Sequence, residues 1–182
     1  MSSKAEFKKL TYLTSRNIKL YFKDKMTFLV SLITPLILLV LFIAFLKSTY
    51  ESSLISITQG FNLDQKLIDA FTGGWLFSSV LATSCITVAF CSGIMVIDKI
   101  NRANIDFMVS PVKKSTLQLS YVLANLFSTL IVTFVLLVVG LVYLACVGFY
   151  ISFVDLLLII FGIVVTSLFG TLLANIIWTF TH

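Results

Sequence analysis

The chain has 182 residues, of which 59% are hydrophobic and 12% are charged, and its formal net charge is +5. Soluble domains carry about 25% charged residues, so this chain has too few charges to cover a water-exposed surface. Its cations flank apolar runs, which is the pattern of a protein at the inner face of a membrane. We therefore expect an integral membrane protein. The net positive charge is explained by the membrane surface, so nucleic acid is excluded as a partner.

Residues 1–25 are polar but have helical periodicity. On a helical projection, seven apolar side chains form one arc, and most of the cations form the opposite arc. Such a helix lies in the headgroup layer, with its lysines toward anionic lipid. We expect residues 1–25 to form a cytoplasmic interfacial helix; the alternative is a solvated helix that precedes the first span. The apolar arc consists of Leu20, Leu13, Leu10, Tyr21, Phe7, Ile18 and Phe22.

Four long runs carry no charge, and an uncharged apolar run of 18 or more residues is typical of a transmembrane helix. The fold class that we predict is all-α: a polytopic transmembrane helix bundle over 26–182, preceded by the interfacial helix. Pro35 falls inside the first span and predicts a kink there. Residues 47–70 are expected to form a polar loop, with one short helix near Asp64–Phe71. The predicted spans are about 26–46, 71–97, 117–146 and 156–180.

Residues 98–116 form the second polar segment. Ile100, Ala103 and Phe107 share one helical face, which predicts a short amphipathic helix up to about Val109. Ser110–Pro111 then predicts a helix restart, with serine as N-cap and proline at the first helical position.

The fourth span carries a small residue at every fourth position. Small residues with this spacing allow close approach of two transmembrane helices, so the ridge is expected to be a packing surface, within the chain or between subunits. Its members are Gly162, Thr166, Gly170 and Ala174.

The distribution of Lys and Arg predicts the orientation. Residues 1–25 hold seven of them and residues 98–116 hold four, whereas 47–70 hold two and the turn after the third span holds none. Cytoplasmic loops carry the excess of Lys and Arg. The N-terminus, residues 98–116 and the C-terminus are therefore expected in the cytoplasm, in a multi-pass protein of the plasma membrane.

Motifs for catalysis or ligand binding are missing from the sequence. There is no Gly-x-x-x-x-Gly-Lys phosphate loop, no Gly-x-Ser-x-Gly nucleophile motif, and a single histidine, His182. The predicted spans contain no Asp, Glu, Lys or Arg, which an ion-coupled carrier would need. We expect no catalytic residue, metal or cofactor in this chain, and a partner protein that supplies the energy.

Together these features resemble the membrane subunit of type-two ABC exporters, over about residues 5–180. Those permeases begin with a cytoplasmic amphipathic helix and a first span that often contains a proline, here Phe7–Lys25 and Pro35. Between their second and third spans lies a cytoplasmic coupling segment with charged residues, a short helix, a Ser/Thr-Pro step and basic residues. The matching positions here are Asp98, Arg102, Asp106, Phe107, Ser110 and Pro111, followed by Lys113 and Lys114.

The resemblance implies that two permease subunits pair, as a homo- or heterodimer, and that each sits on a cytoplasmic P-loop ATPase. Phe107 would fill a groove on the ATPase, and Asp98, Arg102 and Asp106 would set its orientation through rim charges. Membrane lipid is the other expected partner. An ordinary cytoplasmic loop, with Phe107 lying back on the membrane, is the alternative for this segment.

Two departures from the family pattern matter. Gly73–Gly74 stands where family members often have Pro-Gly, and the family has six spans whereas this chain has four. The resemblance therefore implies an incomplete or truncated chain. A four-span scaffold or regulatory subunit that does not transport is the main alternative function; an ion-coupled carrier and an intramembrane enzyme are the others.

Overall fold

The computed structural model describes residues 3–57, 65–103, 107, 109–110, 112–147 and 152–180. Within those ranges the secondary-structure elements are all helices, which confirms the predicted all-α class. The elements are α1 (Ser3–Lys23), α2 (Lys25–Leu41), the π-helix η1 (Phe42–Leu46), α3 (Lys47–Ile57), α4 (Gln65–Cys91), α5 (Ile94–Ile100), α7 (Lys114–Val147) and α8 (Phe153–Phe180).

Four helical segments are long and apolar enough to cross a membrane, which agrees with the predicted number and order of spans. The first of them has 33 residues and is about 50 Å long at 1.5 Å per residue, well beyond a hydrocarbon core of about 30 Å. The polar loop expected over 47–70 is therefore wrong in part, because α3 is helical over Lys47–Ile57; helix from Gln65 onward agrees with the short helix expected near Asp64–Phe71, which is continuous with the second span as α4. The segments are Lys25–Ile57, Phe71–Ile100, Lys114–Ala145 and Phe153–Phe180.

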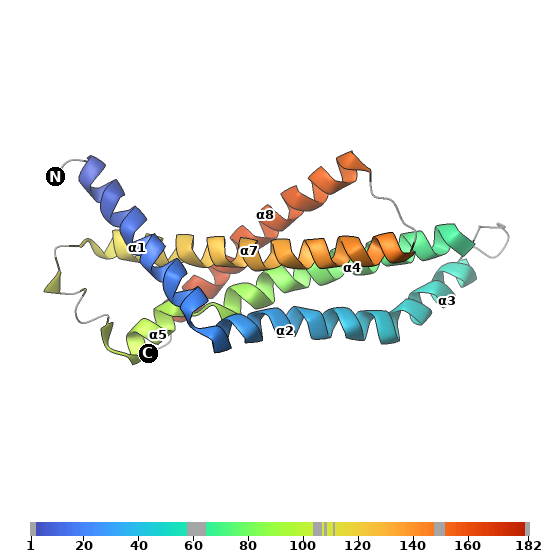
Figure 1. Cartoon of the computed structure of the whole chain (residues 1–182), viewed down its shortest axis with the longest axis horizontal. Coiled ribbons are helices and arrows are strands. Elements are labelled where there is room, and N and C mark those ends of the chain that lie inside the picture. The colour runs from blue at the N-terminus through green and yellow to red at the C-terminus, as the bar shows by residue number, and fades with distance from the viewer. Residues whose placement is uncertain are drawn as a thin grey trace.

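The first span changes direction where α2 gives way to α3 (Figure 1). The π-helical turn η1 lies at this junction, and the backbone N–H of Lys47 donates to the carbonyl of Phe42, five residues earlier. Pro35 is buried inside α2, seven residues before η1. The visible bend thus lies at the π-helical turn, and a kink at Pro35 itself stays a prediction.

Helix α1 crosses the bundle obliquely and packs against α7 and α2 (Figure 1). Its most buried side chains are Thr14, Asn17 and Tyr21, which follow one another at helical spacing. Part of the predicted apolar arc thus faces protein rather than lipid. Phe7 and Tyr12 remain 70% and 80% exposed, so the other end of α1 keeps aromatic side chains available for the membrane interface.

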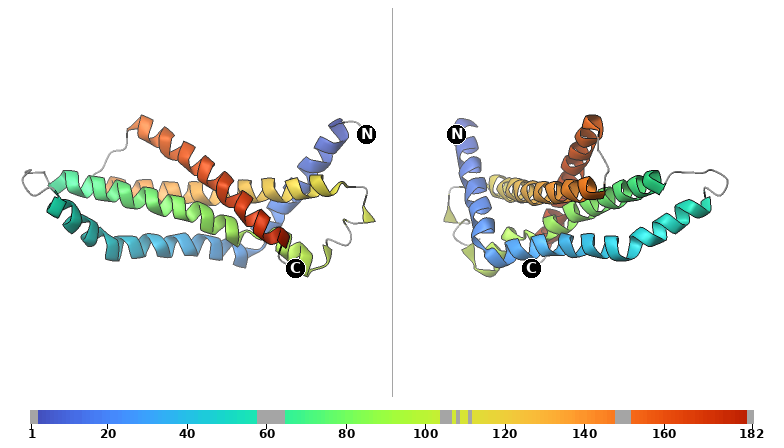
Figure 2. Two further views of the ribbon diagram at one scale, coloured as in Figure 1. Left: turned by 180° about the vertical axis from the view of Figure 1, so that it is seen from behind. Right: turned by 45° about the vertical axis from the view of Figure 1, so that its right-hand side comes forward.

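Helix α8 packs on α4 with its C-terminal half, whereas its N-terminal half diverges from the other spans in every view (Figures 1 and 2). The small-residue ridge reflects this. A Cβ at Gly170 would lie 3.2 Å from the backbone Cα of Ile86 on α4, whereas one at Gly162 would meet nothing within 4 Å. Ala174 is fully buried, and Thr166 is half-buried with its hydroxyl bonded back to the Gly162 carbonyl.

The N-terminus, α5, the start of α7 and the C-terminus lie at one end of the bundle (Figure 1). We call it the basic end, because residues 1–25 and 98–116 hold most of the cations. Helix α3 and the start of α4 lie at the opposite end. This arrangement places α1 beside α5, where the predicted coupling segment begins.

Candidate functional site

The residues predicted for coupling fall on either side of the end of α5. Asp98 lies in α5, which ends at Ile100, and Arg102 follows with a φ of 59°, in the left-handed region. Helix α7 begins at Lys114, and Ser110 lies in a turn where it accepts a hydrogen bond from the Val112 N–H. The predicted helix restart at Ser110 is thus wrong. Asp106 and Pro111 lie outside the described residues.

Asp98 is the centre of a polar network that joins three helices. Its carboxylate, only 4% exposed, accepts two hydrogen bonds from Arg16 of α1, at 2.8 and 3.2 Å. The hydroxyl of Tyr121 on α7 donates a third, at 2.7 Å. Asn17, next to Arg16, reaches Ser120 of α7 at 3.4 Å. We call these five residues the Arg16–Asp98 network.

This geometry explains how a carboxylate can be buried at a membrane boundary. A buried charge is costly unless it is paired and fully hydrogen-bonded, and the bidentate guanidinium–carboxylate arrangement is the strongest such pair. The hydrogen bond to Asp98 also raises the pKa of Arg16 above its ordinary value. The ion pair therefore holds α1 against α5.

Phe107 is attached to the same network. The guanidinium carbon of Arg16 lies 5.1 Å from the centroid of the Phe107 ring, within the range of a cation–π contact. The ring is half-buried. In this structure the Phe107 ring thus contacts the Arg16 side chain of α1.

Two other apolar side chains at the basic end are strongly exposed. Ile100, at the end of α5, is 74% exposed, and Val109, in the segment that follows, is 86% exposed. The sequence placed Ile100 on the apolar face of the predicted short helix, together with Phe107, and Val109 only at the end of that helix.

Helix α1 has a contact with another helix near each of its ends. Lys113, just before α7, forms an ion pair with Glu6 at 2.5 Å, and its hydrogen bond lowers the pKa of that carboxyl. The Tyr21 hydroxyl is hydrogen-bonded to that of Ser31 on α2, at 2.6 Å. Burial of the Tyr21 side chain raises its pKa, which keeps the phenol neutral.

The second span is interrupted between α4 and α5, at Ser92 and Gly93. Asn125 of α7 fits this break: its amide donates to the carbonyl of Ala89 at 3.2 Å, and its side-chain oxygen accepts from the Ser92 hydroxyl. An unsatisfied carbonyl inside a membrane costs several kcal/mol, so Asn125 stabilises the interruption.

Helix α5 also contacts the end of α8. Lys99 donates to the backbone carbonyl of Trp178 at 2.6 Å, and a Cβ at Gly93 would lie 3.4 Å from the Trp178 ring. Helix α5 is therefore a separate seven-residue unit, connected by side chains to α1, α7 and α8.

In the part of the chain that the structure describes, no group of three His, Cys, Asp or Glu side chains is placed to hold a metal ion. The network uses its carboxylate, guanidinium and phenol in mutual hydrogen bonds. Its geometry suits mechanical connection between helices.

Comparison with known proteins agrees with this architecture. The family model described as ABC-2 type transporter matches residues 8–182. No curated protein and no solved structure matches the chain. The match extends from α1 through the four spans, so it includes both α1 and the segment after α5. The chain therefore belongs to the ABC-2 type transporter family, as a multi-pass membrane component that is not itself the catalytic part.

Proposed function

We propose that this chain is the membrane-spanning permease subunit of an ATP-driven exporter and works with a separate cytoplasmic P-loop ATPase. The observation that carries the proposal is the family match over residues 8–182. The fold supports it, because α1 and the segment after α5 lie together at the basic end. A second permease subunit, as a homo- or heterodimer, completes the proposed assembly.

The surface proposed to contact the ATPase is centred on the segment after α5. Ile100 and Val109 expose most of their apolar surface there, and Arg102 is exposed between them. An apolar centre within a polar rim is the usual arrangement of a protein interface. Phe107 lies behind this surface, against Arg16, and Asp106 adds a rim charge in the proposal.

The route from this surface to the spans passes through the Arg16–Asp98 network. Force applied to the segment reaches α1 through Phe107 and Asp98, and reaches α7 through Tyr121. Such side-chain contacts between rigid helices are the means by which a local displacement moves a packed bundle. The interruption at Ser92–Gly93 allows α5 to change angle relative to α4.

The proposal is tested by native pull-down of the N-terminally tagged chain from its own membranes, with mass identification of captured proteins. Recovery of a P-loop ATPase is expected. Absence of an ATPase, with the chain stable alone, would support the four-span scaffold instead.

Point variants then locate the contact. Val109→Asp should reduce ATPase recovery at least tenfold without affecting membrane insertion, because it places a charge at an apolar contact. Phe107→Ala and Asp106→Lys should also weaken recovery. Ile55→Asp is the matched control, an exposed apolar residue on α3 at the opposite end, and should leave recovery unchanged. Equal recovery with Val109→Asp would contradict the placement of the contact.

The orientation is tested separately. Single cysteines at Lys8 and at Ser53 should differ in labelling by a membrane-impermeant maleimide applied to intact cells. Only the Ser53 site should react, because the basic end is expected in the cytoplasm. Labelling at Lys8 would reverse the topology.

A further inference from the structure

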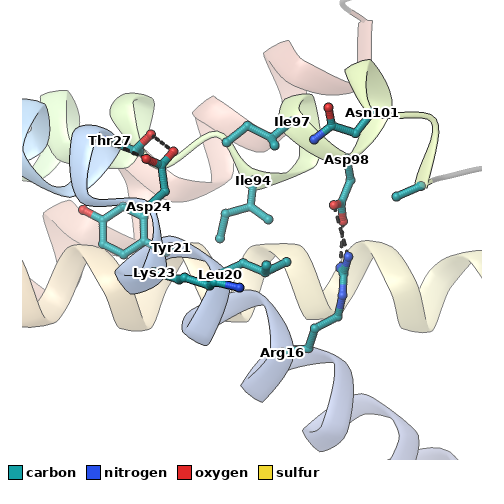
Figure 3. A pocket seen from close by; sticks show the side chains of 11 residues that line it. Arg16, Leu20, Tyr21, Lys23, Asp24, Thr27, Ile94, Ile97, Asp98 and Asn101 are labelled. Atoms are coloured by element: carbon teal, nitrogen blue, oxygen red, sulfur yellow. Dashed lines mark hydrogen bonds and ion pairs between the residues drawn. The ribbon is translucent and has the colours of Figure 1, made fainter.

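A hollow of about 410 Å³ opens between the C-terminal half of α1, the start of α2 and α5 (Figure 3). Its walls are largely apolar and its rim is polar. The lining residues that matter are Leu20, Tyr21, Lys23, Ile94, Ile97 and Asn101.

The position of the hollow along the chain places it at the membrane boundary. Lys23 lies two residues before the first span begins, at Lys25, and Asn101 directly follows the end of the second span, at Ile100. Both ends meet at the basic end of the bundle. The apolar wall of Leu20, Ile94 and Ile97 therefore faces the level where acyl chains begin, and Lys23 faces the headgroup level.

The two carboxylates of the hollow are already satisfied within the protein. Asp24 caps α2: it accepts bonds from the Met26 and Thr27 N–H groups and, at 2.6 Å, from the Thr27 hydroxyl. Those hydrogen bonds lower the pKa of Asp24. Asp98 is paired with Arg16 at 2.8 Å. Figure 3 shows both pairs on opposite sides of the hollow, with Lys23 between them.

A second hollow of about 330 Å³ lies on the other side of Leu20 and Lys23. It is lined by Tyr12, Ser15 and Lys19 as well, and carries no carboxylate. Lys19 and Lys23 are one helical turn apart and both exposed. Arg16 also lines both hollows but is paired with Asp98. Lys19 and Lys23 are therefore the cations here that are not part of that pair, with the hydroxyl groups of Tyr12 and Ser15 on one side and the apolar cavity on the other.

We propose that this place binds one anionic phospholipid of the adjacent leaflet. Its phosphate is held by Lys23 and Lys19, and the upper part of one acyl chain occupies the hollow against Leu20, Ile94 and Ile97. Charge complementarity selects the headgroup, because the carboxylates are compensated internally and the two lysines are not part of those pairs. The site is independent of ATPase docking, which the proposed function places beyond α5.

The experiment is native mass spectrometry of the purified full chain, titrated with palmitoyl-oleoyl phosphatidylglycerol. The same titration is repeated with phosphatidylethanolamine and phosphatidylcholine of identical chains. We expect one phosphatidylglycerol to be retained at least tenfold more tightly than either zwitterionic lipid. Lys23→Ala should weaken that binding about fivefold, which is the loss expected for one cation near a lipid phosphate.

Two further variants separate a built site from general attraction. Lys8→Ala removes an exposed cation of the same helix that lines neither hollow, and binding should stay within twofold. Ile97→Trp fills the cavity while keeping every charge, and binding should fall at least tenfold. Circular dichroism and gel filtration verify that each variant is folded.

Three results would overturn the proposal. Equal retention of phosphatidylcholine would show that headgroup charge is not recognised. Equal weakening by Lys8→Ala and Lys23→Ala would show attraction to the whole helix rather than a site. Displacement of phosphatidylglycerol by millimolar glycerol phosphate would assign the lysines to a soluble phosphate.

Discussion

Removing the Arg16 guanidinium should destabilise the whole bundle, because it leaves Asp98 as a buried carboxylate with one remaining partner. Breaking a fully buried pair costs about 3–5 kcal/mol. The Arg16 side chain is 35% exposed, so water compensates part of this cost, and Arg16→Ala should lower the free energy of unfolding by about 2 kcal/mol. Asp98→Asn keeps a hydrogen-bonding group and should lower the free energy of unfolding by only about 1 kcal/mol.

The assay is a double-mutant cycle on unfolding in mixed micelles of mild detergent and dodecyl sulfate. Trp178 is 8% exposed and its backbone carbonyl is bonded to Lys99 of α5, so its fluorescence reports on this end of the bundle in a Trp75→Phe background. The free energy of unfolding of the double variant should fall by less than the sum of the two single-variant decreases. The difference, which is the coupling energy between Arg16 and Asp98, should be about 1–2 kcal/mol.

Lys19→Ala is the matched control, a cation three residues along the same helix that is exposed, and should change stability by no more than about 0.5 kcal/mol. Additive single losses, within about 0.5 kcal/mol, would refute the reasoning, because they would mean that Arg16 and Asp98 do not stabilise each other. If Lys19→Ala lowered the free energy of unfolding as much as Arg16→Ala, the effect would be due to loss of positive charge on α1 in general.

Other contacts make independent predictions. Asn125→Leu should lower the free energy of unfolding by about 1–3 kcal/mol in the same assay, because the Ala89 carbonyl at the helix break loses the Asn125 amide and keeps only the Ser92 hydroxyl as a side-chain donor; a neutral result would exclude that role. Gly170→Leu should lower the free energy of unfolding by about 1–3 kcal/mol, because the larger side chain forces α8 away from α4. Gly162 lies in open space, so Gly162→Leu should leave the free energy of unfolding nearly unchanged. The hydrogen bond from Lys113 lowers the pKa of Glu6. The Glu6–Lys113 ion pair is therefore present above the ordinary pKa of glutamate, and it is lost as the pH falls through the lowered pKa of Glu6. A spin-label distance between α1 and the start of α7 should therefore increase only below about pH 4, and an increase near pH 6 would assign the change to another group.

The four spans were predictable because bilayer insertion depends mainly on composition. Each span is an uncharged apolar run, and such a run gains free energy in lipid whatever the rest of the chain does. Helix α3 was not predictable in the same way, because its serines and threonines favour a loop. The preceding span supplies the helical nucleus, which removes the costly step of helix formation, and the Lys47–Glu51 pair at 3.5 Å supports the first turn.

The polar network could not be predicted, because its members are far apart in sequence. Arg16 and Asp98 are 82 positions apart, and the projection of α1 placed Arg16 on a cationic face toward lipid or water. Thr14 and Asn17 are polar, so hydrophobic periodicity could not identify them as the packing face of α1. Phe107 was predicted from its place on an apolar helical face and from the family resemblance, and only the structure shows that the Arg16 guanidinium lies over its ring.

These contacts give α1 a role that its amphipathic pattern does not reveal. It is hydrogen-bonded or ion-paired to the start of α7 through Glu6, to α5 through Arg16, and to α2 through Tyr21. A displacement of α5 therefore cannot leave α1 unmoved unless a buried ion pair breaks, which costs more than a small rotation of the helix. The helix is interrupted between α4 and α5 at Ser92–Gly93. A displacement of the segment after α5 therefore moves α1, and through α1 the first and third spans, at a lower cost in free energy than it moves α4.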